Sequence, residues 1–220
     1  MASAAQKASA EDKGIVKDGV GMTNEEFYGD KFSSMKSVES RLLSLLDLYA
    51  QTVEEKEGLK PIIYTCSRIK SPDNMVAKLK RKGLETTPEA ALNKLYDAIG
   101  IRAVCAFAED VYRLVDWLKK RCELKVCEEK DYYAVPKPNG YRSYHLLVKM
   151  RGGKNKGFKA EIQVRTIAND FWATLEHRLK YKKIIPHEEI VYEELKRCAF
   201  EIASVDASMQ AIRDILKEKI

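Results

Sequence analysis

Six cationic side chains fall within fifteen residues of the chain, a density that suits a polyphosphate ligand. The six are Arg68, Lys70, Lys78, Lys80, Arg81 and Lys82. Lys78 and Lys82 are four residues apart and share one face of a predicted helix, which Lys70 can approach from the preceding loop. Arginine supplies planar contacts and lysine a compact charge, and both suit phosphate oxygens. A solvated basic face explains the same residues as well.

Arg102 stands in the middle of a nearly apolar segment, residues 99–107. A guanidinium group in an otherwise buried strand is costly unless it meets an anion or an aromatic surface. Arg102 therefore predicts a ligand at the face or edge of a sheet. Asp97 lies five residues earlier, and we expect it at the junction before regular strand geometry begins. Taken alone, Asp97 also fits a structural cap.

Glu161 lies in a segment, residues 158–166, in which apolar and polar side chains alternate. Phe158, Ala160, Ile162 and Val164 fall on one side, and Lys159, Glu161, Gln163 and Arg165 on the other. This pattern predicts a strand with one face in the core. A half-exposed strand without a special role fits too, but the other candidates favour a Glu161 that faces a ligand.

The segment PKPNGYRSYH, residues 136–145, combines a rigid turn with aromatic side chains. Two prolines and an Asn-Gly pair predict the turn, and the following strand would place Tyr141, Ser143 and His145 on one side. A tyrosine ring can stack on a nucleobase, a contact worth on the order of 1–3 kcal/mol. A plain loop with a surface tyrosine is the alternative.

Strands alternate with helices between two helical ends, which predicts an α+β (mixed α/β) fold. The expected helices are residues 24–56, 71–82, 88–95 and 109–122, one that starts near 167, and one at the C-terminus. The expected strands are 61–66, 99–107, 124–133, 144–150 and 158–166, with 67–70 as a loop. Residues 1–22 show no apolar period and predict a flexible tail.

The C-terminal helix carries an apolar heptad seam. Its members are Val191, Leu195, Cys198, Ile202, Val205, Met209, Ile212 and Leu216. Steps that alternate between four and three residues are typical of helix pairing. Packing inside its own chain and assembly of subunits are equally open. We expect a domain at 23–185 and an oligomerisation element at 186–220.

The composition is that of a globular protein with an anionic partner. The 39 Lys and Arg outnumber the 33 Asp and Glu, and a net charge of +6 suits an anionic ligand without demanding nucleic acid. The five cysteines include no CxxC pair, so neither a disulfide framework nor a zinc site is predicted. No leader and no apolar run of about 18 residues occurs, and we expect a cytoplasmic protein.

Four segments, in this order, resemble motifs of the synthetase domain of the RelA/SpoT family, in its small single-domain branch. They are SRIKSPDNMVAKLKRKG (67–83), LYDAIGIRAVC (95–105), DYYAVPKPNGYRSYH (131–145) and EIQVRTIANDFWATLEHRLKYK (161–182). With the helical flanks, the resemblance covers residues 24–220. It implies a nucleotidyltransferase-like mixed β-sheet flanked by helices. It also implies an enzyme of the stringent response that moves the β,γ-pyrophosphate of ATP to the 3′-hydroxyl of GDP or GTP, which yields (p)ppGpp and AMP.

The resemblance also implies roles for individual residues. On the donor side, Arg68 and Arg102 would sandwich adenine, and Lys70, Lys78 and Lys82 would hold the ATP phosphates. Asp97 would bind Mg²⁺, and Glu161 would share that metal or accept the proton of the 3′-hydroxyl. On the acceptor side, Tyr141 would stack on guanine, with Lys137, Asn139, His145 and Gln163 around the nucleotide and Glu176 near its base.

Several points stay open at this level. Related enzymes act on adenine nucleotides or a tRNA end, and a non-catalytic RNA-binding module would also use the basic helix. Such a module needs neither Asp97 nor Glu161, which would repel phosphate without a metal. Small relatives are commonly homotetramers, and RNA or alarmone are open as effectors, whereas no membrane or DNA partner is expected. The Asn169-Asp170 pair departs from the Met-Asn usual in close relatives, and no role is assigned to Asp170.

Overall fold

The protein is built around a five-stranded mixed sheet, seen in a computed structural model that describes residues 21–180 and 187–217. The strands are β1 (Ile62–Ile69), β2 (Ile99–Cys105), β3 (Leu124–Asp131), β4 (Tyr144–Met150) and β5 (Lys159–Thr166). Their order across the sheet is β1-β2-β5-β4-β3, and only β2 and β5 are parallel. The helical elements are α1 (Asn24–Tyr28), α2 (Lys31–Glu57), α3 (Pro72–Arg81), α4 (Pro88–Lys94), α5 (Ala108–Lys119), a 3-10 turn at Gly153–Asn155, α6 (Ile167–Lys180) and α7 (Glu188–Lys217).

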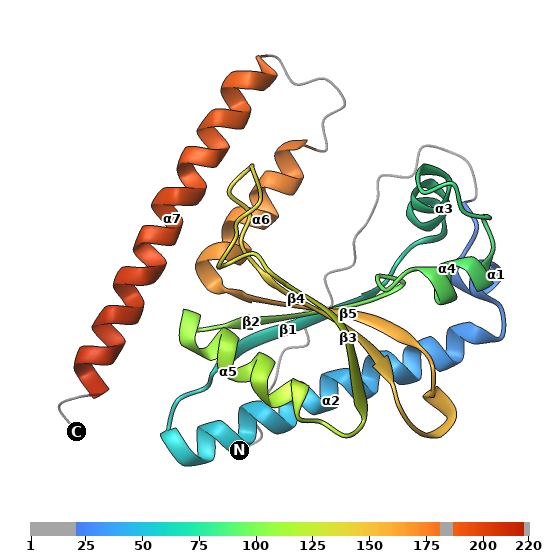
Figure 1. Ribbon diagram of the computed structural model, residues 1–220, viewed down its shortest axis with the longest axis horizontal. Coiled ribbons are helices and arrows are strands. Elements are labelled where there is room, and N and C mark those ends of the chain that lie inside the picture. The colour runs from blue at the N-terminus through green and yellow to red at the C-terminus, as the bar shows by residue number, and fades with distance from the viewer. Residues whose placement is uncertain (1–20, 181–186, 218–220) are drawn as a thin grey trace, which may run out of the picture.

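Helices α2 and α5 cover one face of the sheet, and the core lies between them and the strands (Figure 1). Tyr49 of α2 meets Trp117 of α5, so the two helices lie side by side on that face. The alternation in β5 decides which side is buried: Ala160, Ile162 and Val164 are in the core. This arrangement confirms the predicted mixed α+β fold. The other face of the sheet is left to polar residues, with α3 and α6 at its two sides.

Several predicted ends differ from the structure by one to three residues, and two predictions are wrong in kind. The predicted loop at 67–70 is largely the end of β1, because residues 67–69 continue the antiparallel pairing with β2. The predicted helix at 24–56 is two helices, since Gly29 takes a positive φ of 54° that ends α1, whereas Thr23 and Glu26 form a capping box at its start.

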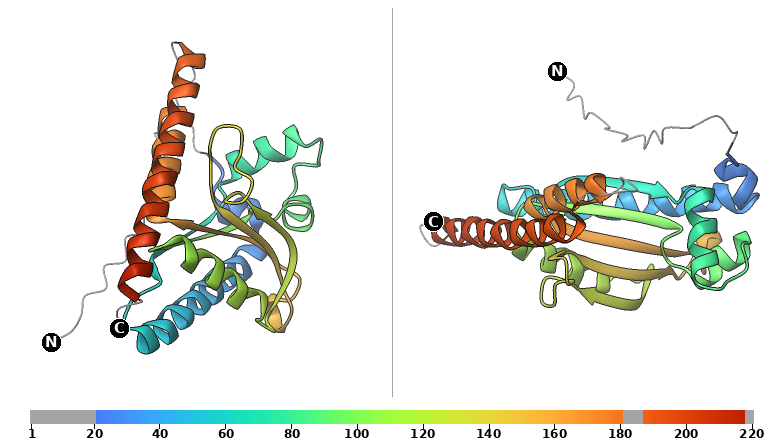
Figure 2. Two further views of the ribbon diagram at one scale, coloured as in Figure 1. Left: turned by 60° about the vertical axis from the view of Figure 1, so that its left-hand side comes forward. Right: turned by 90° about the horizontal axis from the view of Figure 1, so that it is seen from above.

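The heptad seam of α7 divides into two halves. Leu195, Cys198 and Ile202 pack against Trp172 of α6, which runs alongside α7 in both views of Figure 2. The members closer to the C-terminus are exposed: Val205, Met209, Ile212 and Leu216. In this half the side turned to the domain is polar, because Asp206 and Arg213 are its buried residues. Intrachain packing therefore accounts for only the first half of the seam.

The predicted tail at 1–22 lies outside the described residues except for its last two, and the boundary at 185/186 lies outside them entirely. The boundaries of the three proposed units stay predictions. Within the described ranges, no helix has both the length and the hydropathy to span a membrane.

Candidate active site

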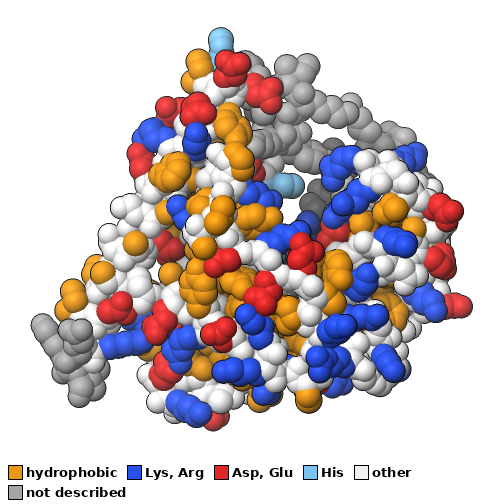
Figure 3. Space-filling model, in the orientation of Figure 1, with side chains coloured by type: hydrophobic (Ala, Val, Ile, Leu, Met, Phe, Trp, Pro, Cys, Tyr) orange, Lys and Arg blue, Asp and Glu red, His pale blue; other side chains and the backbone are white. Residues whose placement is uncertain are grey.

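The open face of the sheet collects side chains from β1, β2, β4 and β5, because residues paired across strands point to the same side. Gly100 pairs with Arg68 on one side and with Glu161 on the other, and Arg102 pairs with Gln163. His145 in turn pairs with Gln163. This register puts five of the predicted residues on one surface. Figure 3 shows a hollow between the part that carries α6 and the part that carries α3, with Lys and Arg side chains at its margins.

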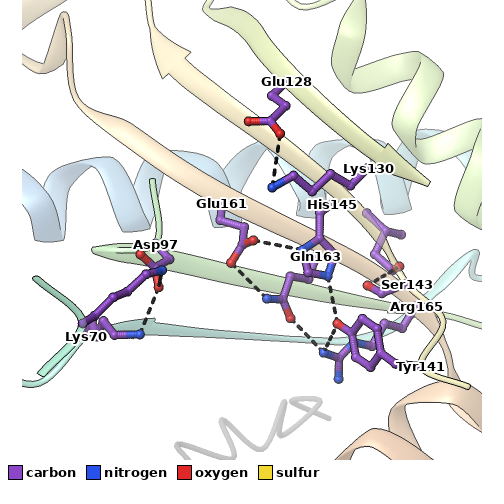
Figure 4. A network of polar contacts seen from close by, with 12 residues as sticks. Lys70, Asp97, Glu128, Lys130, Tyr141, Ser143, His145, Glu161, Gln163 and Arg165 are labelled. Carbon is purple, nitrogen blue, oxygen red and sulfur yellow. Dashed lines mark hydrogen bonds and ion pairs between the residues drawn. The ribbon is translucent and has the colours of Figure 1, made fainter. Parts of the chain in front are cut away.

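Glu161 is held by two hydrogen-bonding partners (Figure 4). The distance from His145 Nδ1 to Glu161 Oε1 is 2.9 Å, and Gln163 Nε2 donates to Oε2 at 3.0 Å. Burial alone would raise the pKa of Glu161, but the contacts with His145 and Gln163 outweigh it and hold that pKa below its usual value. Glu161 is therefore an anion at neutral pH and presents a negative charge to the hollow.

Asp97 lies between α4 and β2, as predicted, and binds two lysines. Lys70 Nζ is 2.9 Å and Lys78 Nζ 2.5 Å from Asp97 Oδ2. Lys70 directly follows β1, and Tyr28 fixes it by donating a 2.9 Å hydrogen bond to its carbonyl oxygen. Burial would raise the pKa of Asp97, but the hydrogen bonds from Lys78 and Lys70 outweigh that effect and lower it. Asp97 is thus also an anion, and its field acts on Glu161.

Asp97 could serve as a ligand of a magnesium ion. Asp97 Oδ1 is buried and has no hydrogen-bond partner among the described residues, so a ligand atom is available at that position. Mg²⁺ in nucleotide-processing enzymes is commonly held by one or two carboxylates, with substrate phosphates and water as the other ligands. No cluster of three or more acidic, histidine or cysteine ligands occurs in the described part of the chain. The site therefore suits an ion that arrives with phosphates.

A hydrogen-bonded chain links Tyr141 to Glu161. Arg165 Nη2 donates to the Tyr141 hydroxyl at 2.7 Å, and that hydroxyl lies 2.8 Å from His145 Nε2. Arginine can only donate and an ionised carboxylate can only accept. The Tyr141 hydroxyl therefore accepts from Arg165, and His145 Nδ1 donates to Glu161. The chain of contacts runs from Arg165 through Tyr141 and His145 to Glu161.

Tyr141 belongs to a small aromatic platform at the margin of the hollow. The ring of Tyr132 meets that of Tyr141 edge to face, with centroids 5.9 Å apart. Lys137 Nζ lies 4.7 Å from the centroid of Tyr132 and 4.8 Å from that of Tyr141. A planar ring with a cation beside it suits a nucleobase that carries phosphates. Tyr141 thus lies where the turn-forming sequence predicts a stacking residue.

The turn that carries this platform depends on α6 and α7. Asn139 Nδ2 donates to Glu176 of α6 at 3.0 Å, and Asn139 Oδ1 accepts from the Tyr141 backbone N–H. Gly140 has a φ of +84°, and a Cβ atom at this position would lie 2.5 Å from the Cβ of Ala199 in α7. Only glycine meets both conditions. The close approach fixes the turn against α7.

The remaining predicted residues lie apart from these contacts. Arg68 is exposed on β1, where its side chain lies beside Gly100, two residues before Arg102 on the neighbouring strand. Lys82 is exposed just after α3 and forms no ion pair with another described side chain, whereas Lys78 does. The structure therefore groups Lys70 and Lys78 with Asp97 and leaves Lys82 outside the group.

Sequence reasoning missed three residues of this face. Arg165 shares the polar side of β5 with Glu161, so the alternation contained the signal for it. Tyr132 gives no such signal, because only the tertiary fold brings it to Tyr141. Asp170 is buried at the start of α6 and contacts Arg102 and Arg165. Arg102 meets the anion that its buried strand requires, and that anion belongs to the chain itself.

Comparisons with known proteins agree with this arrangement. The family described as "Region found in RelA / SpoT proteins" matches residues 67–185. The GTP pyrophosphokinase YwaC of Bacillus subtilis is 42% identical over 159 residues, which cover 71% of this chain and 76% of the relative. YjbM of the same organism, also a GTP pyrophosphokinase, is 31% identical over 197 residues, or 88% of this chain and 90% of the relative.

Solved structures give the same picture. The small alarmone synthetase 1 of Bacillus subtilis, bound to its product pppGpp, superposes with a TM-score of 0.76 at 30% identity and covers 84% of this chain and 95% of its own. The small alarmone synthetase 2 of that organism superposes with a TM-score of 0.74 at 36% identity, over 84% of this chain and 98% of its own.

Proposed function

Since the chain belongs to the RelA/SpoT family, we propose that it transfers the β,γ-pyrophosphate of ATP to the 3′-hydroxyl of GDP or GTP and so makes (p)ppGpp. One observation supports this proposal above all. Asp97 with its two lysines, Glu161, and the Tyr141 platform all lie on one face of the sheet. Transfer at phosphorus depends mainly on position and on neutralisation of the charge on phosphate oxygens. A face with both features suits that chemistry.

The donor nucleotide would lie on the side of β1 and α3. Arg68 and Arg102 flank Gly100, whose missing side chain leaves the strand surface flat between the two guanidinium groups, as a stacked adenine requires. Lys70 and Lys78 are close to Asp97 and can hold the β- and γ-phosphates by small side-chain rotations. Lys82 would reach the phosphates only from the end of α3, so we assign it the smaller contribution.

The acceptor nucleotide would lie on the Tyr141 platform. The guanine would stack on Tyr141, with Glu176 and Asn139 at the edge of the base and Lys137 with His145 toward the phosphates. Gln163 lies between the two sides, because it contacts both Glu161 and Arg165. Mg²⁺ held by Asp97 and Glu161 would supply positive charge to the phosphate oxygens. Glu161 would also accept the proton of the 3′-hydroxyl, since its carboxylate is ionised and faces the hollow.

We further propose that the exposed half of α7 pairs with a second copy of the chain, within a homotetramer. Four apolar side chains at heptad spacing are exposed there, whereas the side turned to the domain is tied by polar contacts, including Arg213 to Asp110 at 3.0 Å. A helix gains little from such a stripe unless another surface covers it. We place the enzyme in the cytoplasm, where its substrates occur, and in the stringent response.

The test is to incubate the protein with labelled ATP, Mg²⁺ and one acceptor at a time: GDP, GTP, ADP or an uncharged tRNA. The nucleotides are then resolved by chromatography. We expect AMP and a 3′-pyrophosphorylated guanine nucleotide in equal amounts. Absence of any AMP-coupled product would refute the reaction, and a product formed only from ADP or tRNA would refute the guanine acceptor.

A further inference from the structure

Asp170 is a buried carboxylate in the first turn of α6 that receives groups from three adjacent strands. Its side chain is 6% exposed. Arg165 Nη1 of β5 donates to Oδ1 at 3.0 Å, and Arg102 Nη1 of β2 lies 3.2 Å from the same oxygen. Tyr64 of β1 donates to the other oxygen, Oδ2, at 2.6 Å. Both oxygens of this carboxylate are therefore engaged within the chain.

The charges around Asp170 explain what a carboxylate contributes at this position. Arg102 and Arg165 extend from neighbouring strands, and Arg165 is only 6% exposed, so solvent screens the repulsion between them poorly. Asp170 places one negative charge between the two cations. Burial is the main cause of a raised pKa at Tyr64, and the hydrogen bond to Asp170 adds to it. The hydroxyl of Tyr64 therefore stays protonated and able to donate. An asparagine at 170 would retain the shape and lose the charge.

The two arginines lead to different halves of the proposed site. Arg102 flanks the donor position, whereas Arg165 donates to the Tyr141 hydroxyl and to Gln163 Oε1 on the acceptor side. On the basis of the proposed function, we propose that Asp170 is a positioning residue that fixes the donor arginine and the acceptor platform relative to each other. One oxygen atom, Oδ1, is the shared anchor.

The experiment measures binding of single nucleotides, so that it does not depend on turnover. The affinities of Asp170→Asn for a non-hydrolysable ATP analogue and for GTP are compared with those of the unsubstituted chain by calorimetry. Loss of a charge-assisted anchor should weaken each affinity by about tenfold. Asp110→Asn is the matched control, because it also removes a buried carboxylate between two arginines, Arg113 and Arg213, on the other side of the sheet. It should leave both affinities unchanged.

A double substitution separates positioning from a general loss of structure. If Asp170 acts on ATP through Arg102, Asp170→Asn should no longer weaken ATP binding in an Arg102→Ala background, yet should still weaken GTP binding. Equal losses in both backgrounds, or unchanged affinities in the single variant, would overturn the proposal. If Asp170→Asn does not fold, Tyr64→Phe replaces it in the experiment, because this variant keeps the carboxylate and removes one of its hydrogen bonds. Tyr64→Phe should weaken both affinities by roughly twofold to fivefold. Unchanged affinities in Tyr64→Phe would also overturn the proposal. An unsubstituted chain that binds both nucleotides without transferring pyrophosphate would refute the proposed function alone.

Discussion

Replacement of Asp97 by asparagine should separate nucleotide binding from turnover. The Asp97 carboxylate accepts from two lysines at 2.9 Å and 2.5 Å, and it is 16% exposed. Charge-assisted hydrogen bonds each contribute about 1.5–3 kcal/mol when buried. The lysine side chains are 16% and 22% exposed and can turn toward solvent, so we expect a loss of stability of only about 1–3 kcal/mol in total.

The effect of Asp97→Asn on activity should be much larger than its effect on stability. The variant loses the buried oxygen that suits the metal, and we expect the turnover number to fall by at least about a thousandfold, or roughly 4 kcal/mol of transition-state stabilisation. Lys70 and Lys78 lose their anion, so the affinity for ATP without Mg²⁺ should be equal or higher. The measurements are steady-state kinetics, calorimetry without metal, and thermal unfolding.

Asp73→Asn is the matched control for this prediction, because Asp73 is an exposed acid in the first turn of α3, close in sequence to the same lysines. It should leave turnover unchanged. A turnover number of Asp97→Asn within about threefold of the unsubstituted chain would contradict the assignment of Asp97 to the reaction. A lower affinity for ATP without metal would contradict the assignment of its lysine partners to the phosphates.

Three further predictions concern other parts of the molecule. Tyr141→Ala should raise KM for the guanine nucleotide by about tenfold and leave KM for ATP unchanged, since stacking on an aromatic ring contributes about 1–3 kcal/mol. Equal changes in the two KM values would argue against stacking of guanine on Tyr141. Met209→Lys should reduce the mass of the particle in solution, as measured by light scattering. Ala207→Lys adds a cation on another side of α7 and should leave the mass unchanged. An unchanged mass in both variants would contradict the proposed interface. Burial raises the pKa of Asp206, although the hydrogen bonds from Thr166 and Asn169 oppose this. The ionised carboxylate is therefore a cost to the fold at neutral pH, so Asp206→Asn should raise the free energy of unfolding at pH 7, and the gain should vanish as the pH falls and the carboxyl becomes protonated in both states. A gain that persists at low pH would rule out this origin.

Local patterns in the sequence predicted the strands of the sheet and the side of β5 that faces away from the core. Alternation placed Glu161 opposite the core. The apolar surroundings of Arg102 predicted a ligand, whereas the anion that Arg102 meets is Asp170 of the same chain. The side of β5 that carries Glu161 could be predicted because a side chain's direction on a strand follows from neighbouring residues alone. The position of Asp97 before β2 followed in the same way, since the apolar run begins only after it.

The contacts between segments could not be predicted. Asp170 meets Tyr64 across 106 positions of sequence, and nothing near either residue indicates the other. The end of β1 was misjudged for a similar reason: Arg68 and its neighbours read as a polar loop, but β2 supplies hydrogen-bonding partners that extend the strand. The pairing of Lys70 and Lys78 with Asp97 likewise depends on where α3 packs, which composition does not specify.

The close approach of Gly140 to Ala199 has a practical consequence for work with this protein. Because α7 forms the wall behind the turn that carries Tyr141, a shortened chain without that helix would lose the support of this turn along with any subunit contact. Truncation is therefore a poor way to obtain an active monomer. Point changes among the exposed apolar residues beyond Ala199 leave the wall intact, and they are the substitutions with which to ask whether a single subunit works alone.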